Sequence, residues 1–221
     1  AFHREAVTSD LPWRRIKPFQ SVEGVRMRWL RLAECKAIIA ATDPEFRPMV
    51  QAALLTGARY GELCRLCVSD YDGEAATLRL RETKSGVSRS VYLNSEGNRF
   101  FRAMASNRPG HEPMMPRPDG LPWGPSQQSR FMMKACAEGN VCPPASYHDL
   151  RRTYGAQLAL KGVPMAVIAE ALGHKDERIT RRHYAHLERS YVADTIRNAL
   201  NPLGIEPSPL PVVSAVKEFC G

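Results

Sequence analysis

The feature that most restricts the fold of this chain is a change in the spacing of its apolar residues. In "LRLAECKAIIAAT" (30–42) and "FRPMVQAALLTG" (46–57), apolar residues recur at helical spacing. Between 74 and 94 they alternate with polar residues in "TLRLRE" and again in "SRSVYL", and "TKSG" stands between the two runs. Alternation on both sides of a glycine-containing turn is typical of a β-hairpin. The sequence therefore predicts helices followed by a short antiparallel pair of strands.

Helical patterns dominate the rest of the chain. A third helix is predicted to begin at "ARYGELCRL", and others at roughly 126–139, 147–161, 164–172 and 178–199. The segment 108–126 is rich in Pro and Gly, which predicts a long irregular connection. We therefore expect an α+β fold that is mostly helical, with one small antiparallel β-sheet.

The two ends of the chain differ from its middle. Residues 1–28 show little apolar periodicity and hold prolines and basic residues, which predicts a basic interdomain linker or arm. The basic residues are Arg14, Arg15, Lys17, Arg26 and Arg28. Residues 201–221 carry four prolines followed by a short apolar run, which predicts a tail detached from the core.

The charge balance indicates a polyanionic partner. Lys and Arg number 31 against 23 Asp and Glu, a formal net charge of +8. A surplus of this size is typical of proteins that bind nucleic acid or an acidic membrane surface. No run approaches the roughly 18 apolar residues that a membrane span needs. We therefore expect no membrane association and favour nucleic acid.

Cysteines and histidines raise the alternative of a metal site. Cys64-x-x-Cys67 has no second such pair or matching histidine pair nearby, and it lies in an apolar helical stretch. His183 and His186 could share a helical face, but no third ligand is evident. The spacings therefore predict no metal site. The scattered cysteines favour reduced thiols over a disulfide framework; they are Cys35, Cys64, Cys67, Cys136, Cys142 and Cys220.

Two basic residues stand where they could meet a phosphate. Arg59 opens a helix just after a glycine, and a guanidinium beside exposed backbone N–H groups suits a phosphate, although a lone arginine is more often a surface residue. Lys84 lies at the predicted hairpin tip in "ETKSGVSR". A lysine there is commonly a solubility residue, but it could also enter a DNA groove and donate a proton.

Two histidines, an arginine and a tyrosine extend this set. His148 and Arg151 are three apart in "YHDLRRTYGAQLAL", so imidazole and guanidinium could converge on one oxyanion, or His148 could be an ordinary helix-start residue. His174 follows the glycine that ends a helix. Tyr184 lies ten residues further on, in the basic stretch "ERITRRHYAHLERS", and is either a packing residue or a nucleophile.

In this order the residues resemble the catalytic signature of the tyrosine recombinase (phage integrase) family. The supporting strings are "LLTGARYGEL", "TKSGVSRSVYL", "HDLRRTYGAQL" and "LGHKDERITRRHYAH", spread over about residues 30–199. One string alone is weak evidence, whereas the ordered set is highly specific. His174 and Tyr184 are ten residues apart where many members have nine, a difference that one loop residue can absorb.

The resemblance implies an organisation for the chain. Residues 29–200 are expected to form the catalytic domain, with the tyrosine-recombinase fold. The basic segment 1–28 would then be what remains of the connection to the family's N-terminal core-binding domain. Residues 201–221 are expected to dock on a neighbouring protomer, because related recombinases exchange C-terminal segments.

The resemblance also implies cleavage and rejoining of DNA without metal, ATP or another cofactor. Tyr184 is the expected nucleophile, exposed among cations that favour its phenolate, and it forms a 3′-phosphotyrosine bond. Lys84 is the expected general acid for the leaving 5′ oxygen. Charge on the phosphate would be stabilised by the remaining site residues, Arg59, His148, Arg151 and His174. Glu62 would support the geometry of the arginines.

The expected partners are double-stranded DNA and other protomers, with a monomer in solution and a tetramer on DNA. We expect the basic arm to contact phosphates rather than base edges. The resemblance also implies that the protein is encoded by a bacterium or phage, in a mobile element. It would then act in the cytoplasm, at the nucleoid. The alternatives are a Xer-like chromosome resolvase and a DNA-binding module without strand transfer. A metal-dependent nuclease is a third, but it lacks a carboxylate cluster.

Overall fold

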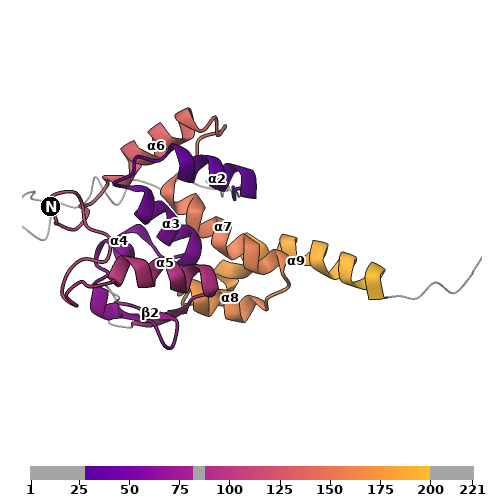
Figure 1. The fold of residues 1–221 in the computed structure, drawn as a ribbon. Helices are drawn as coiled ribbons and strands as arrows, with labels where there is room; N and C mark the ends of the chain where they lie inside the picture. The colour runs from indigo at the N-terminus through magenta and orange to yellow at the C-terminus, as the bar shows by residue number, and fades with distance from the viewer. Residues whose placement is uncertain (1–27, 82–87, 200–221) are drawn as a thin grey trace, which may run out of the picture.

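The chain is described here by a computed structural model that covers residues 28–81 and 88–199 (Figure 1). Its elements follow in chain order: α2 (Leu32–Ala41), α3 (Arg47–Thr56), α4 (Tyr60–Cys64), the 3₁₀ turn η2 (Val68–Asp70), β1 (Tyr71–Asp72), β2 (Thr77–Leu80), β3 (Arg89–Tyr92), α5 (Ser95–Ala105), α6 (Gln128–Glu138), α7 (Tyr147–Leu160), α8 (Met165–Leu172) and α9 (Glu177–Ala199). The mostly helical fold with one small antiparallel sheet is confirmed.

Helix α7 lies at the centre of the structure and contacts α3, α8 and α9. Helices α2 and α6 lie side by side at one end of the body, and β2 lies toward the opposite end (Figure 1). The first part of α9 packs on α7 and α8, whereas its far end extends away from the body (Figure 1). Helix α8 contacts both α7 and β3 and so links the sheet to the central helix.

The sheet has three antiparallel strands in the order β1-β2-β3. Leu78 of β2 pairs with Val91 of β3, and both are buried, while Arg79 between the two buried leucines of β2 is exposed. This alternation is the period of two that predicted the hairpin. Strand β1 has only two residues, too few to give a period, and the sequence did not predict it.

The helix predictions agree with the structure within a few residues, with two exceptions. The helix expected at "ARYGELCRL" has only five residues. Helix α5 was not predicted, although its residues Phe100, Phe101, Met104 and Ala105 recur at helical spacing and pack on the core. A signal for it was present in Asn94, whose side chain accepts a hydrogen bond from the N–H of Gly97 (2.8 Å) as an N-cap. The segment 108–126 is irregular, as expected.

The core has two parts. In the larger one, the ring of Phe46 stacks on Phe131 with centroids 4.5 Å apart and meets Trp123 edge-on at 4.9 Å. The smaller one joins the inner faces of α7, α8 and the first half of α9. It contains Ala156, Ala159, Met165, Ile168, Leu172, Tyr184 and Leu187. Helices α8 and α9 are thus held to α7 by a separate apolar contact.

One glycine allows α7 and α9 to approach closely. A Cβ atom at Gly155 would lie 2.5 Å from Cζ and 2.6 Å from the hydroxyl oxygen of Tyr184, closer than real side chains approach. The Tyr184 ring therefore lies directly on the backbone of α7, and only 5% of the residue is exposed.

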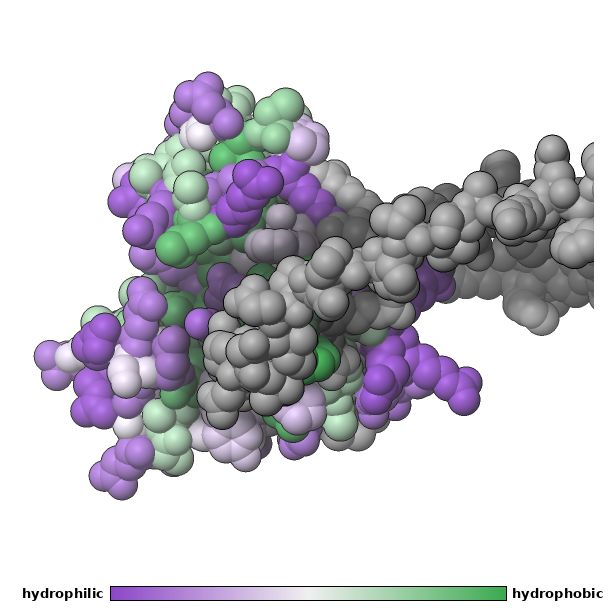
Figure 2. Space-filling model, turned by 90° about the vertical axis from the view of Figure 1, so that its right-hand side faces the viewer, coloured by the Kyte–Doolittle hydropathy of each residue, from purple (hydrophilic) through white to green (hydrophobic). Residues whose placement is uncertain are grey.

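The surface in Figure 2 is mostly hydrophilic, with smaller hydrophobic areas between the polar groups. Within the described residues, no helix has the length and apolar character that crossing a bilayer requires. The described cysteines are all free thiols, as expected: Cys35, Cys64, Cys67, Cys136 and Cys142. Cys220 lies outside the described residues.

Replacement of Gly155 by Ala tests the contact between α7 and α9. In an ordinary helix interior this change is stabilising by roughly 1 kcal/mol. Here the new methyl group would overlap the Tyr184 ring, so we expect the free energy of unfolding to fall by roughly 1–3 kcal/mol, measured by urea denaturation. In a Tyr184→Ala background the same change should be neutral or stabilising. An equal loss in both backgrounds would show that the ring is not the obstacle.

Candidate active site

Arg59 stands at the N-cap position of α4. Gly57 ends α3 with a left-handed φ of 62°, which turns the chain toward α4. The Glu62 carboxylate accepts hydrogen bonds from the backbone N–H of Arg59 (2.7 Å) and from its Nη1 (2.8 Å). Arg59 Nη2 donates to the carbonyl oxygen of Gly173 (3.3 Å), yet 43% of its side chain stays exposed. The guanidinium is therefore oriented by the protein and still accessible to a ligand.

Arg151 lies behind Arg59 and is almost fully buried, with 3% of the residue exposed. Its Nη1 donates to the carbonyl oxygen of Gly57 (2.6 Å), and its Nη2 donates to that of Leu172. Both acceptors belong to helix C-terminal ends, where unpaired carbonyls and the helix dipole favour a cation. Burial, and then repulsion by Arg59 and Arg89, lower the pKa of Arg151 to about 9.

His148 lies one turn before Arg151 on α7. His148 is exposed to solvent at the rim of the site, yet the surrounding protein, and then the charges of Arg152 and Arg151, lower its pKa. His148, Arg151 and Arg59 line one hollow of about 300 Å³ between α4, α6 and α7. The histidine and arginine that stand three residues apart in the sequence thus line the same hollow, and their convergence on one oxyanion stays a prediction.

His174 follows the C-cap glycine of α8. Its Nδ1 is hydrogen-bonded to Oγ1 of the fully buried Thr180 (2.7 Å). Burial, and then the charges of Arg151 and Arg59, lower the pKa of His174 to about 4, so the ring is neutral at pH 7. His174 and Arg59 line a second hollow of about 270 Å³, on the side of the sheet. Arg59 therefore stands between two hollows, each with one histidine.

Tyr184 is not exposed, and that expectation was wrong. Its ring packs on Gly155, and burial raises the pKa of the phenol although Arg151 and Arg152 act to lower it. Burial therefore outweighs the neighbouring cations, and the phenol stays protonated in this conformation. The basic residues of its stretch mostly lie on the outer face of α9, while Tyr184 lies on the inner face.

Several predicted residues cannot be placed. Lys84 falls in 82–87, outside the described residues, as does most of the basic arm: Arg14, Arg15, Lys17 and Arg26. Arg28 is described, and its Nη2 pairs with Oε1 of Glu34 (2.8 Å) with only 12% of its side chain exposed. Arg28 therefore has a partner within the domain.

The sequence interpretation missed two groups of the site. Arg89, at the start of β3, pairs with Glu62 (Nη2 to Oε2, 3.0 Å), and that partner lies 27 residues earlier in the chain. Thr180 is hydrogen-bonded to the His174 ring. In the sequence, its position four residues before Tyr184 would have indicated that it lies on the same face of α9. Burial would raise the pKa of Glu62, but Arg89 and Arg59 hold it below its usual value.

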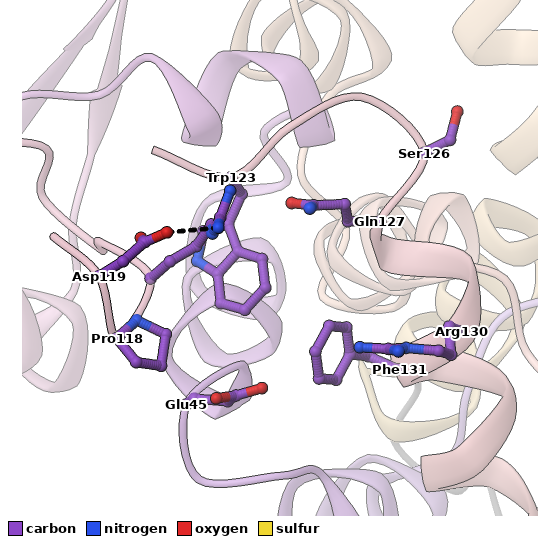
Figure 3. Close-up of a pocket in the computed structure, with 9 residues that line it drawn as sticks. Glu45, Pro118, Asp119, Trp123, Ser126, Gln127, Arg130 and Phe131 are labelled. Carbon is purple, nitrogen blue, oxygen red and sulfur yellow. Dashed lines mark hydrogen bonds and ion pairs between the residues drawn. The ribbon is translucent and has the colours of Figure 1, made fainter. Parts of the chain in front are cut away.

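A further hollow of about 570 Å³ lies between the irregular segment and α6. Figure 3 shows Trp123 and Phe131 in its lining together with Glu45, Asp119 and Arg130. Its charges are of both signs, and none of the predicted catalytic residues that the structure describes lines it. In the part of the chain that the structure describes, no three His, Cys, Asp or Glu side chains are grouped to hold a metal ion.

Comparison with known proteins places this geometry among recombinases. The chain is 26% identical over 182 residues to the integrase of Salmonella phage P22, an alignment that covers 78% of this chain and 47% of that protein. The crystal structure of XerA recombinase aligns with a TM-score of 0.66 at 22% identity, over 79% of this chain and 66% of that one. The Tn1549 transposon integrase in complex with circular intermediate DNA aligns with a TM-score of 0.64 at 18% identity, over 84% and 69%.

These likenesses in structure establish the fold. The chain spans about half the length of several of the relatives that it matches in sequence. Residues 28–190 match the Phage integrase family, and this span holds the two arginines, the two histidines and Tyr184. Because the match covers well over half of the 221 residues, the chain belongs to the phage integrase family.

Proposed function

We propose that this chain cleaves and rejoins DNA through a 3′-phosphotyrosine intermediate. The observation that carries the proposal is the arginine pair. Arg59 and Arg151 both donate to the C-terminal end of α8, one accessible and one buried, and a histidine stands on each side of Arg59. Preorganised cationic donors of this kind stabilise charge that develops on the nonbridging oxygens of a phosphodiester.

In the proposed reaction each residue has one task. Arg59 binds a nonbridging oxygen, and Arg151 supplies fixed positive charge from behind it. The oxygen of Tyr184 forms a bond to phosphorus as the bond to the 5′ oxygen breaks, and the phenol proton passes to the neutral ring of His148. Lys84 donates a proton to the leaving 5′ oxygen. The ring of Tyr184 has to leave Gly155 before this attack, because it is buried in the described conformation.

His174 contributes a neutral hydrogen bond in this proposal. A neutral imidazole has one donor and one acceptor nitrogen. With Nδ1 accepting the hydroxyl proton of Thr180, Nε2 carries the ring proton and can donate to the phosphate. No metal or cofactor takes part.

The wider setting is also proposed from the family. The net charge of +8 and the complex of the Tn1549 transposon integrase with circular intermediate DNA support duplex DNA as the partner. We place the catalytic domain at 29–200, with 1–28 as a basic linker on the phosphates. Residues 201–221 would dock on a neighbouring protomer within a tetramer assembled on DNA. The protein would act in the cytoplasm, at the nucleoid.

Replacement of Tyr184 by Phe tests the nucleophile. The change removes one oxygen and keeps the ring, so folding and DNA binding should survive while covalent chemistry stops. The substrate is a pool of labelled, nicked duplexes of randomised sequence, enriched for binding and incubated in EDTA. The parent should form a protein–DNA adduct that withstands denaturing electrophoresis, and Tyr184→Phe should form none. Tyr191→Phe on the same helix should retain the adduct. An adduct with Tyr184→Phe, or one that requires a metal ion, contradicts the proposal.

Replacement of Lys84 by Ala tests the general acid. Loss of a proton donor should slow cleavage by roughly 10²–10⁴-fold. A duplex whose bridging 5′ oxygen is replaced by sulfur needs no such proton, because a thiolate leaves unaided. On that duplex Lys84→Ala should cleave nearly as fast as the parent, whereas Tyr184→Phe stays inactive. If sulfur does not restore the rate, Lys84 is a binding residue.

The lowered pKa of His174 predicts a pH dependence of stability. Above pH 6.5 the ring is neutral in both the folded and unfolded states. As the pH falls from 6.5 toward 4, the unfolded chain binds a proton that the folded chain does not, so the free energy of unfolding decreases. His148 and His183 act in the same direction. Urea denaturation across this window should show a steeper loss for the parent than for His174→Gln. Equal slopes would show that His174 is not held neutral.

A further inference from the structure

Arg89 joins three parts of the site. Its side chain is 15% exposed and lies between α4, β3 and α8. Nη2 donates to Oε2 of Glu62 (3.0 Å), and Nη1 donates to the carbonyl oxygen of Ala171 (2.5 Å). The same Oε2 atom accepts the backbone N–H of Arg59 (2.7 Å). A single carboxylate oxygen of Glu62 therefore connects the Arg89 side chain to the backbone of Arg59.

The end of α8 is the second point of contact. Three successive carbonyl oxygens there accept from three different arginines: Ala171 from Arg89, Leu172 from Arg151, and Gly173 from Arg59. His174 is the next residue in the chain. Any shift of the α8 end relative to α4 would therefore change the position of His174 relative to Arg59.

Gly173 shows how closely Arg89 is fitted to this end. A Cβ atom at position 173 would lie 2.6 Å from both Cδ and Nε of Arg89. The Arg89 side chain thus lies directly on the backbone of the α8 C-cap. A shorter or branched side chain could not keep this contact together with the hydrogen bonds to Glu62 and Ala171.

We propose that Arg89 is a positioning residue for DNA cleavage: it fixes Glu62, and through it the Arg59 guanidinium, against the end of α8 that carries His174. The expected effect of Arg89 on the cleavage rate rests on the proposed function. Its effect on the orientation of Arg59 rests on the geometry alone. Arg89 has no contact with the reacting atoms in this proposal. Its loss should therefore lower the rate of the chemical step and leave DNA affinity nearly unchanged.

The test compares Arg89→Met and Arg89→Lys with the parent in single-turnover cleavage of the enriched nicked duplex at saturating protein. Misplacement of a catalytic group by about 1 Å can cost roughly 10²-fold, so we expect the Met variant to be slower by roughly 10–100-fold with a similar Kd. Arg89→Lys should restore little of the cleavage rate, because one ammonium group cannot bind both Glu62 and the Ala171 carbonyl as the planar guanidinium does. Arg79→Met, which removes an exposed cation from the neighbouring strand, is the matched control and should cleave at the parent rate.

Two further measurements separate positioning from other roles. If Arg89 acts through Glu62, then Arg89→Met and Glu62→Gln should be non-additive in the cleavage rate. If it acts on Arg59 rather than on Lys84, the duplex with bridging sulfur should not restore Arg89→Met.

The third readout needs no cleavage. Nitrogen-15 NMR of the free protein should show the Arg59 guanidinium in hindered rotation in the parent and rotating freely in both Arg89 variants. If the parent forms no adduct but Arg59 is released in the variants, the positioning contact stands and the proposed function fails. If the parent cleaves and the variants match it in rate and in the Arg59 signal, the inference about Arg89 is overturned. The Lys variant, which keeps charge and stem, serves if Met does not fold.

Discussion

The C-terminal end of α8 organises the cations of this site. Three arginines donate to three consecutive carbonyls there, although like charges at such distances repel. Two things offset that repulsion: the negative end of a helix dipole, and one carboxylate, Glu62, shared by Arg59 and Arg89. Burial, and then what remains of this repulsion, lower the pKa values of Arg151 and His174. A phosphodiester brought to Arg59 would add the negative charge that this cluster lacks.

Two glycines make the arrangement possible. Gly57 and Gly173 end α3 and α8 with left-handed φ values of 62° and 64°, and each cap turns the chain sharply into the next site residue. Residues with a Cβ would be strained in that conformation and would also collide, at Gly57 with Tyr154 and at Gly173 with Arg89. The same two turns therefore end the helices, expose the carbonyls that hold Arg151, and place Arg59 and His174 at the surface.

Sequence periodicity was sufficient for most of the fold, because long amphipathic helices and an alternating hairpin bury apolar residues at fixed spacing. It could not reveal Arg89, whose partner carboxylate is distant in the chain. Helix α5 was overlooked, although Phe100, Phe101, Met104 and Ala105 give it a helical period. The error on Tyr184 was avoidable. Thr180, Tyr184 and Leu187 are spaced as one buried stripe of a helix, and all three are buried. The basic neighbours of Tyr184 in sequence occupy other faces of α9 and say little about its burial.

A buried nucleophile is compatible with the proposed chemistry only if the cost of releasing it is modest. Burial of an aromatic side chain is worth roughly 1.5–3 kcal/mol, so undocking Tyr184 from Gly155 would reduce the reactive population by about one to two powers of ten. Helix α9 contacts the body through Tyr184 and Leu187 and also through Tyr191, whose ring lies on Gly162, while its far end extends outward (Figure 1). Release of the Tyr184 ring alone would therefore leave the Tyr191 contact in place. In the proposed reaction, a phosphodiester bound at Arg59 would offset this cost, and the released phenol would lose the burial that raises its pKa while it stays near Arg151, whose charge lowers that pKa.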